Sequence, residues 1–404
     1  FIGASGLPKT DLVGSSDPYF VAKIDDRISY VSTVQINTLK PVWNEIWKVK
    51  NVPAHADLVV DILDKDNGAP HDDFIGKFKT SVAAGAKEVE IEGPFLGIRS
   101  RGTFWIKIDS TPSAPGAQDK PYMFDGPIRY STHMSPTIGM LTQINDARLY
   151  ATWKMYIVGV PLYFGDNYQH WNVNYKAAQS IFEGPIFMRT GIQAGHRMLY
   201  ARSTRNSFGV IESKEEFMKI LQDDILRASR VKPAVYTYII SAEDDSFRFS
   251  ETGATFFVDF ASKHALHANC ATTVRYSGEF HPRPKGGWAG FSENTPDDAV
   301  EWELVIDNNS GTYSPNKALL PMLQALMQAN FPWVTVVAFD HEDPALKESR
   351  EACRTYALKY RGVKQEELQP HAGEGEETLS HQAVVHQQAH RDGIPPVEEP
   401  ESYI

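Results

Sequence analysis

The chain has 404 residues, of which 42% are hydrophobic and 23% are charged, a composition typical of a soluble globular protein with two or three domains. Its formal net charge of −11 argues against non-specific nucleic-acid binding, and no apolar run approaches the roughly 20 residues that cross a bilayer. The only cysteines are Cys270 and Cys353, which argues against a disulfide scaffold or a zinc site and favours a cytoplasmic location.

The charge is unevenly spread along the chain. Residues 1–109 hold 13 Lys and Arg against 15 Asp and Glu, a net charge of −2, and residues 110–362 also have a net charge of −2. Residues 363–404 have a net charge of −7 and few aromatic side chains, so their composition predicts a disordered, acidic, histidine-containing tail. The sequence therefore predicts a multidomain protein with two nearly neutral folded parts and an acidic tail.

The first part, residues 1–109, consists of short segments that are rich in β-branched and aromatic residues and are separated by turn residues. We expect strands over 18–23, 30–34, 45–49, 58–63, 74–78 and 102–108. Because no segment shows a helical period, the pattern predicts an all-β antiparallel sandwich. Residues 110–121 are rich in Pro, Ser and Gly, which is typical of a linker.

Aspartates gather at two turns of this predicted sandwich. Asp11 and Asp17 precede the strand at 18–23, while Asp64, Asp66 and Asp72 follow the strand at 58–63. Like charges at one turn raise the pKa of their neighbours, so either solvent screens these carboxylates or a cation lies among them. Ordinary solvated turn residues are the alternative, because turns favour Asp.

At these residues the sequence resembles the C2 domain family, a calcium-dependent phospholipid-binding β-sandwich. The matching stretches are DLVGSSDPYF (11–20), TLKPVWNEIW (38–47) and LDKDNGAPHDDFIG (63–76), and the resemblance covers about residues 1–109. The resemblance implies a calcium site formed by Asp11, Asp17, Asp64, Asp66 and Asp72. The position of GTFWIKI (102–108) after the last aspartate loop resembles the family's second, circularly permuted topology.

The chemistry of these residues agrees with the resemblance. Alternate residues of an extended segment point the same way, so Asp64 and Asp66 can face one site, to which the backbone carbonyl of Lys65 can add a ligand. Calcium takes six to eight oxygen ligands. Two bound ions would change the net charge of residues 1–109 from −2 to +2, which favours anionic headgroups. We interpret Asp61 and Asp73 as solvated bystanders.

The second part, residues 122–362, has the pattern of an α+β domain, and we identify no family resemblance in it. Apolar runs predict strands over 148–164, 234–241, 254–261, 272–280, 300–307 and 333–340. Periodic segments predict helices at about 171–182, 213–228, 315–330 and 344–360. The last elements form one predicted β-α-β unit.

The stretch VIDNNSGTYSPNKALL (305–320) is the strongest local signal in this part. It predicts a strand that ends at Asp307, a glycine-containing turn, and a helix with Ser314 as N-cap and Pro315 in its first turn. A parallel crossover would bring His341, after the next strand, to the same sheet edge. Candidate catalytic residues are Asp307 and His341, and candidate anion-binding residues are Ser310, Gly311 and Thr312. The alternative is a well-capped structural turn followed by an acidic loop.

The leading functional interpretation is a calcium-binding protein of the cytoplasm. Its C2-like part would dock to an anionic phospholipid membrane, as a peripheral protein, or to a protein partner when calcium binds, and residues 122–362 would recognise an unknown ligand. One alternative is a membrane-recruited enzyme with a site near Asp307 and His341. Another is a structural protein that assembles with copies of itself when calcium is present.

Overall fold

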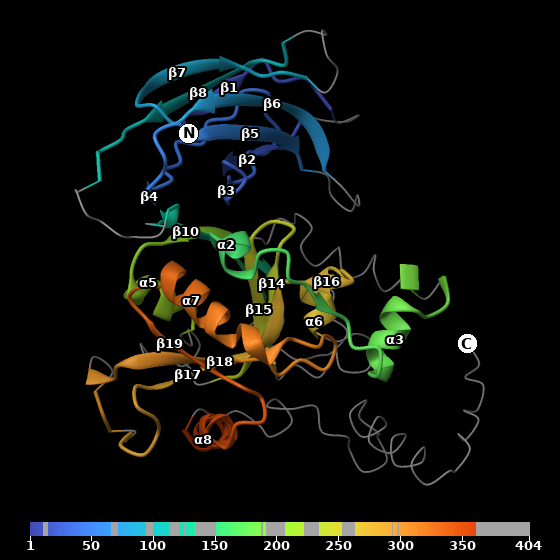
Figure 1. Ribbon diagram of the computed structural model, residues 1–404, viewed down its shortest axis with the longest axis vertical. Coiled ribbons are helices and arrows are strands. Elements are labelled where there is room, and N and C mark those ends of the chain that lie inside the picture. The colour runs from blue at the N-terminus through green and yellow to red at the C-terminus, as the bar shows by residue number, and fades with distance from the viewer. Residues whose placement is uncertain are drawn as a thin grey trace.

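The computed structural model contains a β-sandwich near the N-terminus and a second body of mixed sheet and helix beside it (Figure 1). The structure describes residues 1–10, 15–65, 72–93, 100–113, 121–124, 126–134, 151–186, 189–190, 207–221, 234–252, 263–292, 294–296 and 299–360. The strand predicted at 254–261 and the tail predicted at 363–404 lie outside these residues.

The sandwich confirms the predicted antiparallel β architecture. One sheet has the strand order β3-β2-β5-β6, and the other has the order β1-β8-β7. Their bounds are β1 (Gly3–Ser5), β2 (Pro18–Ile24), β3 (Ile28–Val31), β5 (Asp57–Asp64), β6 (Asp73–Ser81), β7 (Gly85–Glu90) and β8 (Thr103–Ile108). Along β2 and β5 every second residue is buried, because successive side chains of a strand point to opposite faces.

Some strand bounds differ from the predicted ones. The strand predicted at 45–49 is reduced to β4 (Val49–Lys50), which pairs with β9 (Met123–Phe124) rather than with a strand of the sandwich. The sequence does not predict β7, GAKEVE, because its side chains are exposed or half-buried and only Val89 has strong β propensity. Tertiary pairing with β8 therefore forms a strand that local composition does not indicate.

The second body is built on a large mixed sheet. Its strand order is β13-β10-β11-β15-β14-β17-β18-β19, and only the β18–β19 pair is parallel within the described part of the chain. The bounds are β10 (Ile128–Met134), β11 (Ala151–Tyr156), β13 (Ser207–Ile211), β14 (Tyr236–Ser241), β15 (Ser246–Glu251), β17 (Tyr276–Pro284), β18 (Trp302–Asp307) and β19 (Thr335–Phe339). A separate short pair joins β12 (Gln169–His170) to β16 (Thr273–Val274).

Helices lie on both faces of this sheet. They are α2 (Val160–Phe164), α3 (Lys176–Phe182), α5 (Lys214–Ile220), α6 (Lys263–His267), α7 (Leu320–Asn330) and α8 (Pro344–Tyr360), with the 3-10 turn η4 (Lys317–Leu319) before α7. The predicted β-α-β unit is confirmed, since α7 connects the parallel strands β18 and β19. The predicted bounds of α8 are confirmed as well.

The start of α7 corrects the sequence prediction. The sequence predicts that Ser314 caps a helix beginning at Pro315, but Tyr313 pairs with Trp171 in a β-bridge and the chain stays extended there. The side chain of Asn316 instead accepts a hydrogen bond of 2.9 Å from the backbone N–H of Ala318, and α7 begins at Leu320. The segment after Asp307 is therefore a longer, partly extended connection.

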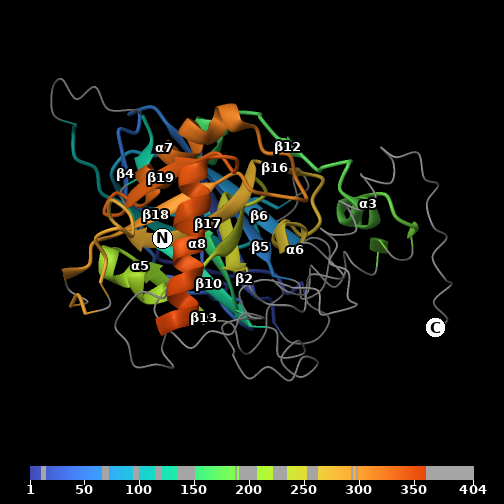
Figure 2. The same ribbon diagram turned by 90° about the horizontal axis from the view of Figure 1, so that it is seen from below.

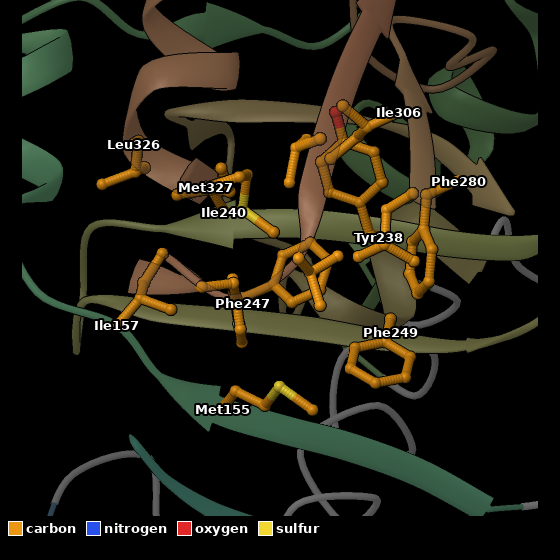
Figure 3. Close-up of a cluster of buried hydrophobic side chains, with 14 of the residues drawn as sticks. Met155, Ile157, Tyr238, Ile240, Phe247, Phe249, Phe280, Ile306, Leu326 and Met327 are labelled. Carbon is orange, nitrogen blue, oxygen red and sulfur yellow. The ribbon is translucent and has the colours of Figure 1, made fainter. Parts of the chain in front are cut away.

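One face of the large sheet is apolar and packs against α7. Figure 3 shows Phe247 and Phe249 of β15 beside Tyr238 of β14, with Leu326 and Met327 of α7 at one side of the cluster. The ring centroids of Phe249 and Phe247 are 5.2 Å apart, so the aromatic rings fill the layer in contact with one another. Burial of each such side chain contributes about 1.5–3 kcal/mol to folding.

The opposite face of the large sheet is polar, yet it is also buried. Directly paired residues form a lateral row from β10 to β17, namely His133, Thr152, Ser250, Thr237 and Glu279. All of them are buried. Helices α6 and α8 cover this face: His267 Nε2 lies 2.9 Å from Ser250 Oγ, and His281 Nε2 lies 2.9 Å from Ser349 Oγ. Figure 2 shows α8 lying across the large sheet.

The sandwich contacts the second body through β3. Arg129 of β10 forms an ion pair of 3.1 Å with Glu45, donates to the carbonyl of Val31, and lies over the ring of Tyr30. Val158, between β11 and α2, belongs to the buried core cluster of the sandwich. The two bodies therefore share a packed, partly ionic interface.

Candidate calcium site

Three of the five predicted aspartate ligands lie within the described residues, at one end of the four-stranded sheet. Pro18, next to Asp17, is the register partner of Asp64, and Asp64 is also the partner of Asp73, next to Asp72. Strand pairing thus brings together carboxylates that are far apart in sequence. The other two predicted ligands, Asp11 and Asp66, lie outside the described residues.

Hydrogen bonds connect the first and second aspartate loops directly. The backbone N–H of Asp17 donates to Asp64 Oδ1 over 2.5 Å, and the backbone N–H of Lys65 donates to the carbonyl of Asp17 over 3.1 Å. Thr10 Oγ1 donates to Asp64 Oδ2, while the N–H of Asn37 donates to Asp17 Oδ1 over 2.6 Å. Asp64 is fully buried, so its orientation is fixed before any ion arrives.

Asp72, the third of these aspartates, contacts the side chains of Lys65 and Tyr19. Lys65 Nζ lies 3.0 Å from Asp72 Oδ1 and 3.0 Å from Asp72 Oδ2, and the hydroxyl of Tyr19 donates to Asp72 Oδ2 over 2.7 Å. Burial and the negative charge of Asp72 raise the pKa of Tyr19 above its usual range, so the phenol keeps its proton and donates. The sequence assigns Lys65 a ligand role through its carbonyl and does not predict this side-chain contact.

The donor chemistry of this end of the sandwich fits calcium. Asp17, Asp64 and Asp72 offer carboxylate oxygens alone, and hard oxygen donors favour calcium or magnesium over softer metals. Within the described ranges, no group of three or more His, Cys, Asp or Glu side chains is arranged to hold a metal ion. A complete calcium site at this end would therefore need Asp11 and Asp66 as further ligands.

At the second predicted site, after β18, the two candidate catalytic residues have separate hydrogen-bond partners. His341 contacts Asn308: its backbone N–H donates to Asn308 Oδ1 over 2.6 Å, and Asn308 Nδ2 donates to Asp340 Oδ2 over 3.1 Å. These contacts confirm that the ends of β18 and β19 lie at one edge of the sheet. They connect His341 to Asn308 and not to the carboxyl of Asp307.

Asp307 contacts Glu279 and Asn309 instead. Its Oδ1 accepts hydrogen bonds of 2.8 Å from the backbone N–H groups of both residues, while its fully buried Oδ2 has no hydrogen-bond partner among the described residues. Burial, reinforced by the negative charge of Glu279, raises the pKa of Asp307 to about 7. Glu279 Oε2 in turn accepts bonds from Asn309 Nδ2 over 2.7 Å and from Arg350 Nη1 over 2.5 Å.

The three candidate anion-binding residues lie in the connection between β18 and η4. Ser310 Oγ accepts a 3.3 Å hydrogen bond from the N–H of Tyr313, and the carbonyl of Thr312 accepts a 2.7 Å bond from the N–H of Asn172. Gly311 faces the ring of Tyr175. These contacts order the segment, and its anion-binding role stays a prediction.

Glu279 is the site residue that the sequence analysis missed. A signal was present, because in YSGEFHPR (276–283) polar residues alternate with Tyr276, Gly278, Phe280 and Pro282. Such alternation places Ser277, Glu279, His281 and Arg283 on one face of β17. The apolar content of the segment is enough to predict a strand, but only the alternation indicates which face the polar residues form.

No helix in the described portion of the protein combines the length and the apolar character needed to cross a bilayer.

Comparisons with known proteins agree with the sandwich. Residues 1–95 match the family described as C2 domain. RasGAP-activating-like protein 1 of Mus musculus is 37% identical over 78 residues, which are 19% of this chain and 10% of that protein. Elicitor-responsive protein 3 of Oryza sativa subsp. japonica is 31% identical over 83 residues, 20% of this chain and 57% of that protein.

Among solved structures, a C2 domain of plant extended synaptotagmin 1 aligns with 26% of this chain and 84% of its own chain, with 23% identity and a TM-score of 0.22. The chain thus matches from a tenth to just over half of the length of the two curated relatives. The matched region holds Asp17, Asp64 and Asp72 and strands β1 to β7. Residues 1–95 of this chain are a C2 domain.

Proposed function

We propose that the C2 domain binds calcium through Asp11, Asp17, Asp64, Asp66 and Asp72 and, when loaded, docks the protein to an anionic phospholipid surface. The likeness of residues 1–95 to C2 domains supports a lipid- or protein-binding module. The observation that carries the calcium proposal is the bond between the N–H of Asp17 and Asp64 Oδ1, because it holds the carboxylate loops together at one end of the sandwich.

The fixed carboxylate of Asp64 would favour ion binding, and the bound ions would favour docking to the membrane. Asp64 is fixed by Thr10 and by the N–H of Asp17, so its carboxylate loses little conformational entropy on binding an ion. Bound calcium supplies positive charge, and two ions would change the net charge of residues 1–109 from −2 to +2. The loaded domain would then attract anionic headgroups within about a Debye length, roughly 8 Å at physiological salt.

Sedimentation with vesicles tests this proposal. The full chain is mixed with phosphatidylserine–phosphatidylcholine vesicles, or with phosphatidylcholine vesicles alone, in calcium or in a chelator. We expect the wild type to sediment only with the anionic vesicles in calcium. The double substitution Asp64→Asn with Asp66→Asn should abolish that sedimentation.

Asp61→Asn is the matched control. Asp61 lies on the same strand, but it pairs with Lys23 Nζ at 3.4 Å, away from the aspartate loops. Calcium-dependent sedimentation that survives the double substitution contradicts the proposal. Calcium binding without sedimentation on any vesicle points to a protein partner as the docking surface.

A second candidate function is a membrane-recruited enzyme whose site is centred on Asp307. The specific observation is a buried carboxyl with one unpartnered oxygen among the described residues, beside Glu279, and with a pKa of about 7. A group that titrates near neutrality can accept or donate a proton during a reaction. The test measures hydrolysis of three probe substrates, namely p-nitrophenyl acetate, p-nitrophenyl phosphate and p-nitrophenyl glucoside.

We expect turnover of one of these probes to fall with Asp307→Asn and to be retained with His341→Ala, while calcium-dependent vesicle binding stays unchanged in both variants. His341 is the matched control because it contacts Asn308 at the same sheet edge. Equal turnover by the wild type and Asp307→Asn, or no turnover at all, would count against this candidate.

A further inference from the structure

Lys65 has an unusual position within the proposed calcium site. It lies between two predicted ligands in the sequence, Asp64 and Asp66, and its ammonium contacts a third, Asp72, at 3.0 Å from each carboxylate oxygen. The side chains of Lys65 and Asp72 are 30% and 14% exposed, so the pair is shielded from solvent more than a typical surface ion pair.

The contacts of Asp72 leave no oxygen free for a metal ion. Both oxygens face Lys65 Nζ, and Oδ2 also accepts the hydrogen bond from Tyr19. Calcium binds carboxylate oxygens at roughly 2.3–2.6 Å. An ion at that distance from Asp72 would lie only a few ångströms from the ammonium, and two positive charges at such a separation repel strongly outside bulk water.

The backbone of Lys65 is held independently of its side chain. Its N–H donates to the carbonyl of Asp17 over 3.1 Å, which fixes the start of the loop. The long, flexible stem of the lysine can therefore swing its ammonium away from Asp72 while the hydrogen bond between the backbones of Lys65 and Asp17 is kept. The geometry allows one cation to replace another at Asp72.

We propose that Lys65 is a built-in competitor of calcium: its ammonium occupies Asp72 in the calcium-free protein and must leave before Asp72 can bind the ion. This inference rests on the proposed calcium function. It states that Lys65 sets the calcium concentration at which the domain responds, by lowering the affinity that the aspartates alone would give.

Calcium titration by calorimetry on the full chain, without lipid, tests the proposal. Lys65→Met keeps the length of the stem and removes the charge, and we expect calcium to bind about twofold to fivefold more tightly than in the wild type, as loss of an ion pair of this kind implies. Lys65→Arg keeps the competing cation, so its affinity should stay close to that of the wild type.

Lys79→Met is the matched control for net charge. Lys79 pairs with Asp57 at 2.7 Å, and Asp57 is at the opposite end of β5 from Asp64. This variant loses the same charge and one ion pair, but its calcium affinity should not rise. Unfolding curves in chelator check that all variants are folded.

The outcomes separate this inference from the function on which it rests. If the wild type binds calcium and Lys65→Met binds it no more tightly, the competitor role is overturned and the calcium function stands. An equal gain in affinity with Lys79→Met also overturns the competitor role, because a general charge effect would then explain the result. If neither the wild type nor Lys65→Met binds calcium, both proposals fail.

Discussion

At the residue scale, the two oxygens of Asp307 have different surroundings. Oδ1 accepts two backbone hydrogen bonds, whereas Oδ2 is buried without a partner in the described structure. Ionisation would leave a buried negative charge next to Glu279, so Asp307 holds its proton to a higher pH in the folded protein than in the unfolded chain. This residue therefore makes the stability of the protein depend on pH.

We predict that Asp307 makes the wild type less stable as the pH rises from about 4 to about 7. The pKa of Asp307 is raised from 3.8 to about 7 in the folded state, so in this interval the folded protein binds more protons than the unfolded chain. Asp307→Asn keeps the oxygen that accepts both N–H groups and removes the titration. In urea unfolding at pH 5 and pH 8, the stability of this variant at pH 8 relative to pH 5 should be higher than the same comparison gives for the wild type.

The matched control for this prediction is Asp73→Asn, which changes an exposed carboxyl of β6. Its unfolding should show the same pH dependence as the wild type. The explanation fails if Asp307→Asn retains the full wild-type difference between the two pH values. Asp245, whose pKa burial raises to about 6, adds a slope of the same sign. Burial lowers the pKa of His133, His264 and His281, which adds slopes of the opposite sign. All of these contributions remain in the variant.

Sequence spacing could place some of the site's residues but not their partners. The resemblance of the Asp-x-Asp stretch and its flanking strands to C2 domains implies that Asp17, Asp64 and Asp72 meet at one end of the sandwich, and the strand register places them there. The contacts of Lys65 and Tyr19 with Asp72 depend on side-chain direction and on burial. Neither is encoded in the spacing of the aspartates.

At the scale of the elements, the approach of β17 to β18 depends on Gly278. A Cβ atom at this position would lie 2.0 Å from the carbonyl oxygen of Asp307, a contact that no side chain could make without moving a backbone. The same carbonyl accepts a 2.7 Å hydrogen bond from the hydroxyl of Tyr238. The glycine thus lets the end of β18 lie directly over β17, where Asp307 and Glu279 meet.

Gly278→Ala should therefore destabilise the protein, by about 1–3 kcal/mol or more, because overpacking between two strands forces the backbone to shift. The midpoint of thermal unfolding measures the effect. Gly290→Ala is the control, since a Cβ atom added there would have no described atom within 4 Å and the midpoint should change little. Equal midpoints for both variants would show that the strands can separate at Gly278 without cost.

The elements also show where local patterns predict structure and where they do not. The bounds of α8 follow from the sequence because Pro344 fits the first turn of a helix and a periodic segment follows it. Strand β15, SFRFSE, is not predicted from the sequence, since its serines and Arg248 lower its apolar content. Its strand conformation is imposed by pairing with β11 and β14, which is a tertiary effect.

At the scale of the whole molecule, Arg129 connects the C2 domain to the large sheet. Its side chain is only 5% exposed, and that of Glu45 is 12% exposed, so both charges are nearly removed from water. Breaking such a pair leaves an uncompensated buried charge, which is far more costly than the loss of an exposed pair. The contact between the two bodies therefore depends strongly on one side chain.

We predict that Arg129→Met lowers the free energy of unfolding by about 3–5 kcal/mol and lets the C2 domain unfold separately from the large sheet. Urea titration followed by tryptophan fluorescence and by far-ultraviolet circular dichroism should then give transitions that no longer coincide.

Lys48→Met is the comparison variant for this interface. Its pair with Glu212 also joins the two bodies, but it spans 4.0 Å and both side chains are more than half exposed. We expect a loss of less than about 1 kcal/mol and coincident transitions. If Arg129→Met unfolds like Lys48→Met, the buried ion pair does not hold the bodies together.

The place of Val158 in the core of the sandwich has a consequence for how this protein would stand on a membrane. A membrane-binding domain joined by a flexible linker can bring a second domain near a bilayer, but the second domain stays free to rotate. Here Val158 of the second body is packed in the core of the C2 domain, and the ion pair of Arg129 with Glu45 stabilises the same interface. Docking would then fix the tilt of the large sheet against the bilayer, so the same edge of the second body would always face the lipid.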